Sequence, residues 1–399
     1  MRRHRLAALA ALALLPADVP AAAGPSVHPA PGADTRHERP EKPVAERISG
    51  RTFPSVFMAW NSADNLPGES RLAVAARHDL MWHDADWYGL VWDREPIGLA
   101  GGFTPQSVTA ARARRSELLR RNPNLILIAE IRYRDAADGF LPADHPWWAR
   151  DDKGARKEGW EEGGFFLLDV RSPDFRTHVA RQAGAVVATG AVDGILLDWW
   201  QDDEERLTLV KEIRAVLGDV PLVLGNANDR TTPQTAPYLN GYFMECYRSG
   251  TPEDWRRIAQ TVTWAETNLR PPRVVCVETW FHGSRRDFNL MRAVTTLVLT
   301  HSDGYCLFSD PNPLPSPDHR HDWYPFWEKS LGRPTGTMTS GPDGTHRREY
   351  EKGTVVYNPM GNAAVDVVFH DLRKSLATGS VSRTHVVKGT DGDIFLKVN

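Results

Sequence analysis

Between residues 53 and 310 the chain alternates short apolar runs with longer segments of helical periodicity. Strands that alternate with helices are typical of βα units in a parallel sheet. The runs at 125–128 and 274–277 are apolar at every position, as expected of parallel strands buried on both faces. Eight strands are predicted, at 55–60, 80–83, 125–133, 193–200, 222–228, 242–247, 274–280 and 305–309.

The helices between these strands have recognisable start signals. Thr104-Pro105, Ser172-Pro173 and Thr251-Pro252 each join a capping hydroxyl to a proline at the first helical position. After the fourth strand, apolar residues from Leu207 to Leu217 form one helix face, and Gly218 can end that helix. Eight strands with alternating helices predict a (β/α)₈ TIM barrel of the α/β class over residues 51–334.

Two segments depart from the barrel pattern. Residues 134–171 are too long, polar and aromatic for a short βα connection. We expect them to form an excursion above the barrel, although 165–170 could be a ninth strand. After residue 334, stretches 349–369 and 380–398 alternate apolar and polar residues, which predicts a small C-terminal antiparallel β-domain over 335–399.

The N-terminus has the pattern of an export signal. A basic start, an apolar run at 6–15 and a small-residue cleavage site at 21–23 predict a signal peptide over 1–23. The apolar run is too short to span a membrane, and no cysteine follows it to carry a lipid anchor. Residues 24–50 contain five prolines and no apolar periodicity, which predicts a flexible linker. We therefore expect a secreted protein without a membrane anchor.

Composition narrows the function classes. A formal net charge of −3 gives no basis for binding nucleic acid. The three cysteines lie in apolar runs and are expected to be buried free thiols, and neither a metal nor an organic cofactor is predicted. The sequence has no Gly-x-Ser-x-Gly nucleophile elbow, no phosphate-binding glycine loop and no dinucleotide-binding fingerprint.

Polar and aromatic residues gather where the predicted strands end, which is the catalytic face of a TIM barrel. Asp198, Glu245 and Glu278 each end an apolar strand, where an unpaired charge is costly unless it is needed. The residues expected to bind substrate at these ends are Trp60, Asn61, His83, Glu130, Arg132, Trp199, Trp200, Asn226, Asn228, Tyr247, Trp280 and Asp310.

This combination favours glycosidic cleavage, which needs two carboxyl groups beside the bond. Asp198 is the predicted nucleophile or base, although it could instead cap a helix or pair with Arg132. Glu245 is the preferred general acid and Glu278 the alternative. Indole faces can stack on sugar rings, although each tryptophan taken singly could be a core residue. Asp193 is given a turn role, and the 318–322 loop is expected to be solvated or substrate-lining.

Two sequence stretches resemble a known family. The run from Leu168 to Arg176, followed by Val192 to Asp198, is similar to the glycosyl hydrolase-like family 15 proteins. More distant resemblances are to endo-α-1,4-polygalactosaminidases and to the α-amylase barrels. The resemblance implies a fourth-strand catalytic aspartate at Asp198, and the polygalactosaminidase pattern implies a sixth-strand glutamate at Glu245. The α-amylase pattern puts its acid on the fifth strand, where this chain has Asn226 and Asn228.

The sequence therefore predicts a secreted glycoside hydrolase that acts on a polysaccharide or oligosaccharide through two carboxylates. One alternative is a catalytically inactive carbohydrate-binding barrel, in which the same acids only bind sugar hydroxyls. Another is lyase or transglycosylase chemistry. The sugar, the anomeric outcome, endo or exo action and the oligomeric state stay open.

Overall fold

The computed structural model describes residues 41–310, 319–328 and 330–398. Its main sheet has eight parallel strands in the order β1-β2-β3-β6-β7-β8-β9-β10. Val56 and Cys306 pair in parallel across the two ends, which closes the sheet into a barrel and confirms the predicted fold class. The strands are β1 (Phe57–Ala59), β2 (Leu80–His83), β3 (Ile126–Glu130), β6 (Gly194–Leu197), β7 (Leu222–Asn226), β8 (Gly241–Cys246), β9 (Val274–Trp280) and β10 (Tyr305–Ser309).

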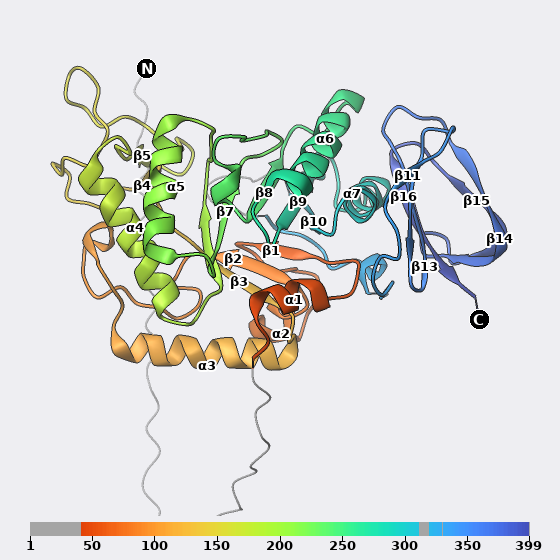
Figure 1. Cartoon of the computed structure of the whole chain (residues 1–399), viewed down its shortest axis with the longest axis horizontal. Coiled ribbons are helices and arrows are strands. Elements are labelled where there is room, and N and C mark those ends of the chain that lie inside the picture. The colour runs from red at the N-terminus through yellow and green to blue at the C-terminus, as the bar shows by residue number, and fades with distance from the viewer. Residues whose placement is uncertain (1–40, 311–318, 329, 399) are drawn as a thin grey trace, which may run out of the picture. The chain divides into compact units, whose positions relative to one another are not determined.

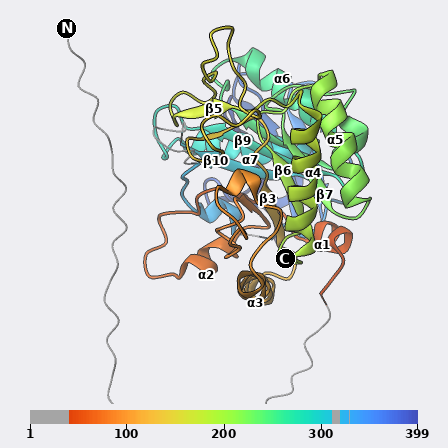
Figure 2. The same ribbon diagram turned by 90° about the vertical axis from the view of Figure 1, so that its left-hand side faces the viewer.

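Helices lie around the outside of the strands (Figures 1 and 2). Between β7 and β8 a single 3₁₀ turn, Ala236–Tyr238, takes the place of an α-helix. None of the helices in the described ranges is long and apolar enough to cross a membrane. The α-helices that follow barrel strands are α2 (Arg71–Ala75), α3 (Pro105–Arg121), α4 (Pro173–Ala188), α5 (Glu204–Leu217), α6 (Pro252–Asn268) and α7 (Phe288–His301).

Two of the three predicted start signals form hydrogen-bonded helix caps. The Ser172 hydroxyl accepts from the Phe175 N–H, and Thr251 forms a reciprocal capping box with Asp254. Gly218 ends α5 with a φ of 70°, in the left-handed region that favours glycine. Thr104 lies at the N-cap of α3, but its hydroxyl makes no capping bond.

The 134–171 segment stays outside the barrel sheet, as expected. Its strands β4 (Asp135–Ala137) and β5 (Phe165–Leu167) pair with each other in an antiparallel ribbon. The ribbon follows β3 directly, so residues of the segment can reach the carboxyl ends of the barrel strands.

The C-terminal domain is one antiparallel sheet in the order β11-β12-β13-β16-β14-β15. It is fixed to the barrel through α7, where Arg292 pairs with Asp391 at 2.8 Å and the Tyr350 hydroxyl donates to the Leu299 carbonyl at 2.7 Å. The strands are β11 (Thr339–Ser340), β12 (His346–Tyr350), β13 (Gly353–Asn358), β14 (Val365–Ser375), β15 (Val381–Val387) and β16 (Asp391–Lys397).

The predicted linker over 24–50 is wrong at its end, where residues form helix α1 (Val44–Gly50). Arg47 of this helix is fully buried and pairs with Asp193. Asp193 also accepts from Arg115 at 2.6 Å and from the Leu127 N–H at 2.8 Å. The partners of Arg47 are distant in sequence, so local composition could not show that this segment is anchored. The predicted signal peptide and the rest of the linker lie outside the described residues.

Candidate active site

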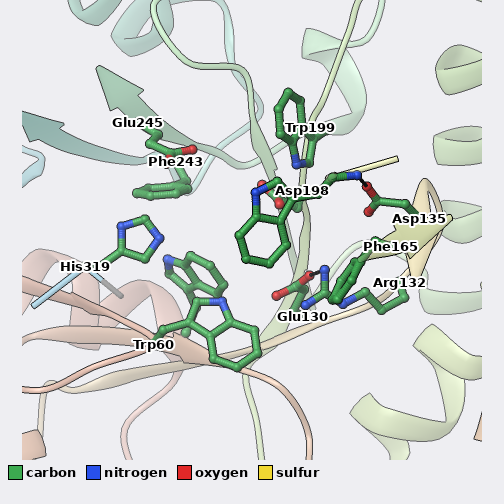
Figure 3. A pocket seen from close by; sticks show the side chains of 12 residues that line it. Trp60, Glu130, Arg132, Asp135, Phe165, Asp198, Trp199, Phe243, Glu245 and His319 are labelled. Atoms are coloured by element: carbon green, nitrogen blue, oxygen red, sulfur yellow. Dashed lines mark hydrogen bonds and ion pairs between the residues drawn. The ribbon is translucent and has the colours of Figure 1, made fainter. Parts of the chain in front are cut away.

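A cavity opens at the carboxyl ends of the barrel strands, where the sequence predicted a site (Figure 3). Three barrel strand ends supply Glu130, Asp198 and Glu245, and Asp198 lies between the other two. The 134–171 segment adds a fourth carboxylate, Asp135. The full lining is Trp60, Trp82, Glu130, Arg132, Asp135, Trp160, Phe165, Asp198, Trp199, Phe243, Glu245 and His319.

The backbone around this cavity is strained. Five non-glycine residues of the described chain have a positive φ, and four of them belong to the cavity or border it. The four are Trp60, Trp199, Asn228 and His319, with φ between 44° and 53°. Residues with side chains rarely adopt this region, and such strain concentrates at functional sites. The strain is therefore independent support for a site at these strand ends.

One amide group joins the two predicted catalytic carboxylates. Asn226 Nδ2 donates to Asp198 Oδ1 at 2.8 Å and to Glu245 Oε2 at 2.9 Å. The Asn226 carbonyl oxygen accepts the Asn228 N–H at 3.2 Å, which fixes the orientation of the amide. Even if these two hydrogen bonds were collinear, the two oxygens that they join would be closer than the separation of about 6.5–9.5 Å found between the carboxyl groups of inverting glycosidases. The hydrogen-bonded oxygens of Asp198 and Glu245 therefore lie closer together than the carboxyl groups of an inverting pair.

Glu245 has the protonation behaviour of a general acid. Burial raises its pKa to about 7, and the carboxylates of Glu278 and Asp198 add to that increase. The positive charge of His319 opposes it. A substantial fraction of Glu245 is thus protonated near neutral pH, when it could give a proton to a leaving oxygen.

Glu278 lies behind the cavity rather than in it. It is fully buried and accepts hydrogen bonds from the Ser309 hydroxyl and from His319 Nδ1, the latter at 2.8 Å. Burial lowers the pKa of His319, but Glu278 and the other site carboxylates outweigh burial and raise it to about 9. Glu278 is therefore placed to hold an imidazolium, and the alternative assignment of Glu278 as the acid does not fit this geometry.

His319 is the main site residue that the sequence reasoning missed. It comes from the 318–322 loop, which was expected to be solvated or substrate-lining. The residue is 2% exposed, and its side chain lines the cavity and packs near Trp82 and Phe243. The spacing of acids and histidines in that loop was a signal of possible site residues. The contact between His319 and Glu278 depends on the fold and could not be predicted from the sequence.

Glu130 is a second carboxyl group that can stay protonated. It is 6% exposed, and burial raises its pKa from 4.5 to about 8 although Arg132 lies 3.0 Å away. A neutral Glu130 can donate a hydrogen bond to a sugar hydroxyl. Arg132 Cζ in turn lies 5.8 Å from the Trp60 ring centre.

The 134–171 segment covers one side of the cavity. Its residues Asp135, Trp160 and Phe165 line the cavity, and Arg134 Cζ lies 4.2 Å from the ring centre of Trp199. The length and aromatic content of the segment had indicated a functional loop, but no single residue in it could be selected from the sequence.

Three predicted substrate-binding residues make structural contacts and do not line the cavity. Trp200 is fully buried and donates its indole N–H to the Thr235 hydroxyl at 3.0 Å. Asp310 is 7% exposed and accepts the Arg320 N–H. The Asn228 side chain donates to the backbone carbonyl of Glu245. These corrections share a cause, because position at a strand end does not say which way a side chain turns.

Four other predicted residues do not line the cavity. The His83 ring lies 4.4 Å from that of Trp60 and is paired with Asp84. Tyr247 and Trp280 contact each other with ring centres 5.9 Å apart. Asn61 directly follows Trp60, and its N–H donates to the Ala59 carbonyl.

Two groups of described residues have ligand atoms close enough to hold a cation. They are His83, Asp84 and Asp86, and also Glu245, Glu278 and His319. In each group the histidine is already hydrogen-bonded to an acid of the same group. The prediction that no metal is needed stays a prediction, and the chemistry derived below uses none.

The sequence matches no protein-family model and no curated protein. The structure is similar to a noncanonic maltogenic α-amylase from Thermotoga neapolitana, with a TM-score of 0.53, 11% identity, and 88% of this chain and 100% of that chain covered. For an α-amylase from Lactobacillus plantarum the values are 0.50, 12%, 89% and 100%. At these identities the likeness establishes a shared fold. The resemblance to family 15 and to polygalactosaminidases stays a prediction.

Proposed function

We propose that this protein is a glycoside hydrolase that cleaves O-glycosidic bonds in a polysaccharide or oligosaccharide with retention of anomeric configuration. The observation that carries the proposal is the Asn226 amide shared by Asp198 and Glu245. It keeps the two carboxyl groups close enough for a nucleophile and an acid to act on one bond. The two structural neighbours are α-amylases, whose activity is consistent with this chemistry.

In the first step Asp198 attacks the anomeric carbon while Glu245 protonates the departing glycosidic oxygen. The bond to the leaving sugar breaks, and a glycosyl ester forms on Asp198. In the free enzyme the negative charge of Asp198 helps to raise the pKa of Glu245. Esterification removes that charge. The pKa of Glu245 should therefore fall in the intermediate, so that Glu245 can act as the base.

In the second step Glu245 takes a proton from water, and the resulting hydroxide attacks the anomeric carbon from the side of the departed sugar. The ester breaks, Asp198 is released, and the configuration is retained by two inversions. His319, held by Glu278, places a buried positive charge beside Glu245. Trp60 and Trp199 offer aromatic faces to sugar rings.

The decisive experiment is hydrolysis of a glycan panel by the purified protein and by its Asp198→Asn variant. The panel contains maltohexaose, cellohexaose and N-acetylchitohexaose. We expect the wild type to release reducing ends from at least one of them and the variant to release none. Proton NMR of the first product should show the starting anomer. Equal turnover by the variant would contradict the assignment, and binding without turnover would favour the inactive carbohydrate-binding barrel.

Export is a separate part of the proposal. The signal-peptide pattern of residues 1–23 supports a secreted enzyme that meets its glycan outside the cytoplasm. Expression of the full chain, followed by N-terminal sequencing of the protein in the medium or periplasm, tests this. We expect cleavage after the alanines at 21–23, whereas an uncleaved product retained in the cells would contradict export.

A further inference from the structure

A second cavity of about 400 Å³ lies beside the active-site cavity. The loop after β2 and the 134–171 segment form most of its walls. The two cavities share Glu130, Arg132 and Phe165. Both cavities therefore lie at the same end of the barrel. A glycan chain bound in the first cavity would lie next to the second.

The shared wall is one layer of side chains. Arg132 Cζ lies 5.1 Å from the Phe165 ring centre, and Arg132 Nη1 lies 3.0 Å from Glu130 Oε1. The Arg132 side chain is 25% exposed. The same three side chains therefore face both cavities, so a glycan several sugars long could contact both at once.

The lining of the second cavity combines apolar and polar side chains, as a sugar ring requires. Trp92, Ile97 and Phe140 supply apolar surface. Trp92 is stacked on Phe103 with ring centres 4.1 Å apart, which holds the indole in one position. An indole face suits the C–H face of a pyranose, and polar groups at the edge can bind its hydroxyls.

One of those polar groups is buried and rigidly held. Gln182 of α4 is 4% exposed, and its amide nitrogen donates to the carbonyls of Ile97 and Ala100, both at 3.1 Å. The remaining polar atom of this side chain is an acceptor for a hydroxyl donor. Asp84, Glu95 and Asp138 add negative charge to the lining, against the single positive charge of Arg132, and this balance disfavours uronic acids and other anionic sugars.

We propose that the second cavity is a subsite for neutral sugar units next to the bond that is cleaved, in the same glycan chain. This proposal rests on the proposed glycosidase function, because it takes the bond to lie between Asp198 and Glu245. The subsite would make the protein prefer long chains over disaccharides.

Binding to the Asp198→Asn protein tests the subsite without turnover. The ligands are maltohexaose, cellohexaose and N-acetylchitohexaose with their matching disaccharides, measured by calorimetry. Ala137→Trp fills the cavity from an exposed lining position, and Trp92→Ala removes the aromatic face. Val91→Ala is the control, since Val91 is 58% exposed and lies outside the lining.

We expect either cavity variant to raise the Kd of the tightest hexasaccharide about tenfold and to leave disaccharide binding unchanged. The Val91→Ala control should match the parent for both ligands. Unchanged hexasaccharide affinity in both cavity variants, equal losses for both chain lengths, or no hexasaccharide binding at all would overturn the subsite. Chain-length-dependent binding without wild-type hydrolysis would support the subsite and contradict the hydrolase.

Discussion

Asp198 and Glu245 accept hydrogen bonds from the same nitrogen atom, the amide nitrogen of Asn226. The arrangement explains why a fifth-strand asparagine stands between acids on the fourth and sixth strands. A carboxylate at this position would add a third negative charge, whereas an amide supplies two donors. Asn226 is 3% exposed, so water cannot readily replace it.

The first prediction concerns this amide. Asn226→Ala should lower kcat by about 10²–10³, because both carboxylates lose an oriented donor in a site where charge develops. The measurement is reducing-end release from the best glycan of the panel. Asn228→Gly is the matched control, since glycine tolerates the φ of 51° and keeps the N–H that binds Asn226. Equal losses in both variants would show that the effect is general disruption.

The roles of the two carboxylates can be separated by the leaving group. A 2,4-dinitrophenyl glycoside of the preferred sugar departs without protonation, so Glu245→Gln should keep its rate of glycosyl-enzyme formation. On the natural glycan the same variant should lose about 10²–10⁴ in kcat. Asp198→Asn should be inactive on both substrates. Rapid-mixing absorbance measures the aryl release, and a burst in Asp198→Asn but not in Glu245→Gln would reverse the assignment.

The pH dependence follows from the pKa of Glu245, which is raised to about 7. Only the protonated acid can start the reaction, so kcat/KM should decline as pH rises through about 7. Carboxyl ¹³C NMR should show the same titration, absent from Glu245→Gln. In Asp198→Asn the pKa of Glu245 should be lower, because a neighbouring negative charge is gone. An unchanged pKa in that variant would remove the physical basis for the switch from acid to base.

Much of the barrel could be predicted because its signals are local. Strands such as 274–280 are apolar runs of the right length, and caps such as Thr251 depend on neighbours three residues away. The face that holds the site follows from the fold itself, which is why Asp198 and Glu245 could be selected. Prediction of their neighbours failed where a side chain could turn inward, as Trp200 does.

Interactions between distant segments could not be predicted from the sequence. Glu278, 41 positions earlier, raises the pKa of His319 and stabilises its positive charge. Nothing local to the 318–322 loop indicates that His319 is buried. Arg47 is similar, since its partner Asp193 is 146 residues away. Both charged residues stand in polar, proline-containing stretches, whose composition predicts exposure to solvent. Their burial depends on partners that are close only in the folded chain.

Glu130 should make stability depend on pH. Its pKa rises from 4.5 to about 8 on folding, so the folded protein binds more protons than the unfolded chain in that interval. The free energy of unfolding should therefore fall as pH rises from about 4.5 to 8. Glu130→Gln should flatten this decline, seen as a smaller Tm difference between pH 5 and pH 8. Glu161→Gln, at an exposed position, is the control, and equal slopes in both variants would contradict the prediction.

Asp193 should be needed for stability and not for catalysis. It lies just before β6, at the end of the barrel opposite Asp198, and accepts from Arg47 and Arg115. Asp193→Ala would leave the fully buried Arg47 without its buried partner, and should cost about 3–5 kcal/mol in the free energy of unfolding. Denaturant unfolding measures the loss, while kcat at a temperature where the variant is folded should match the wild type. A selective fall in kcat with unchanged stability would mean that Asp193 acts on the site.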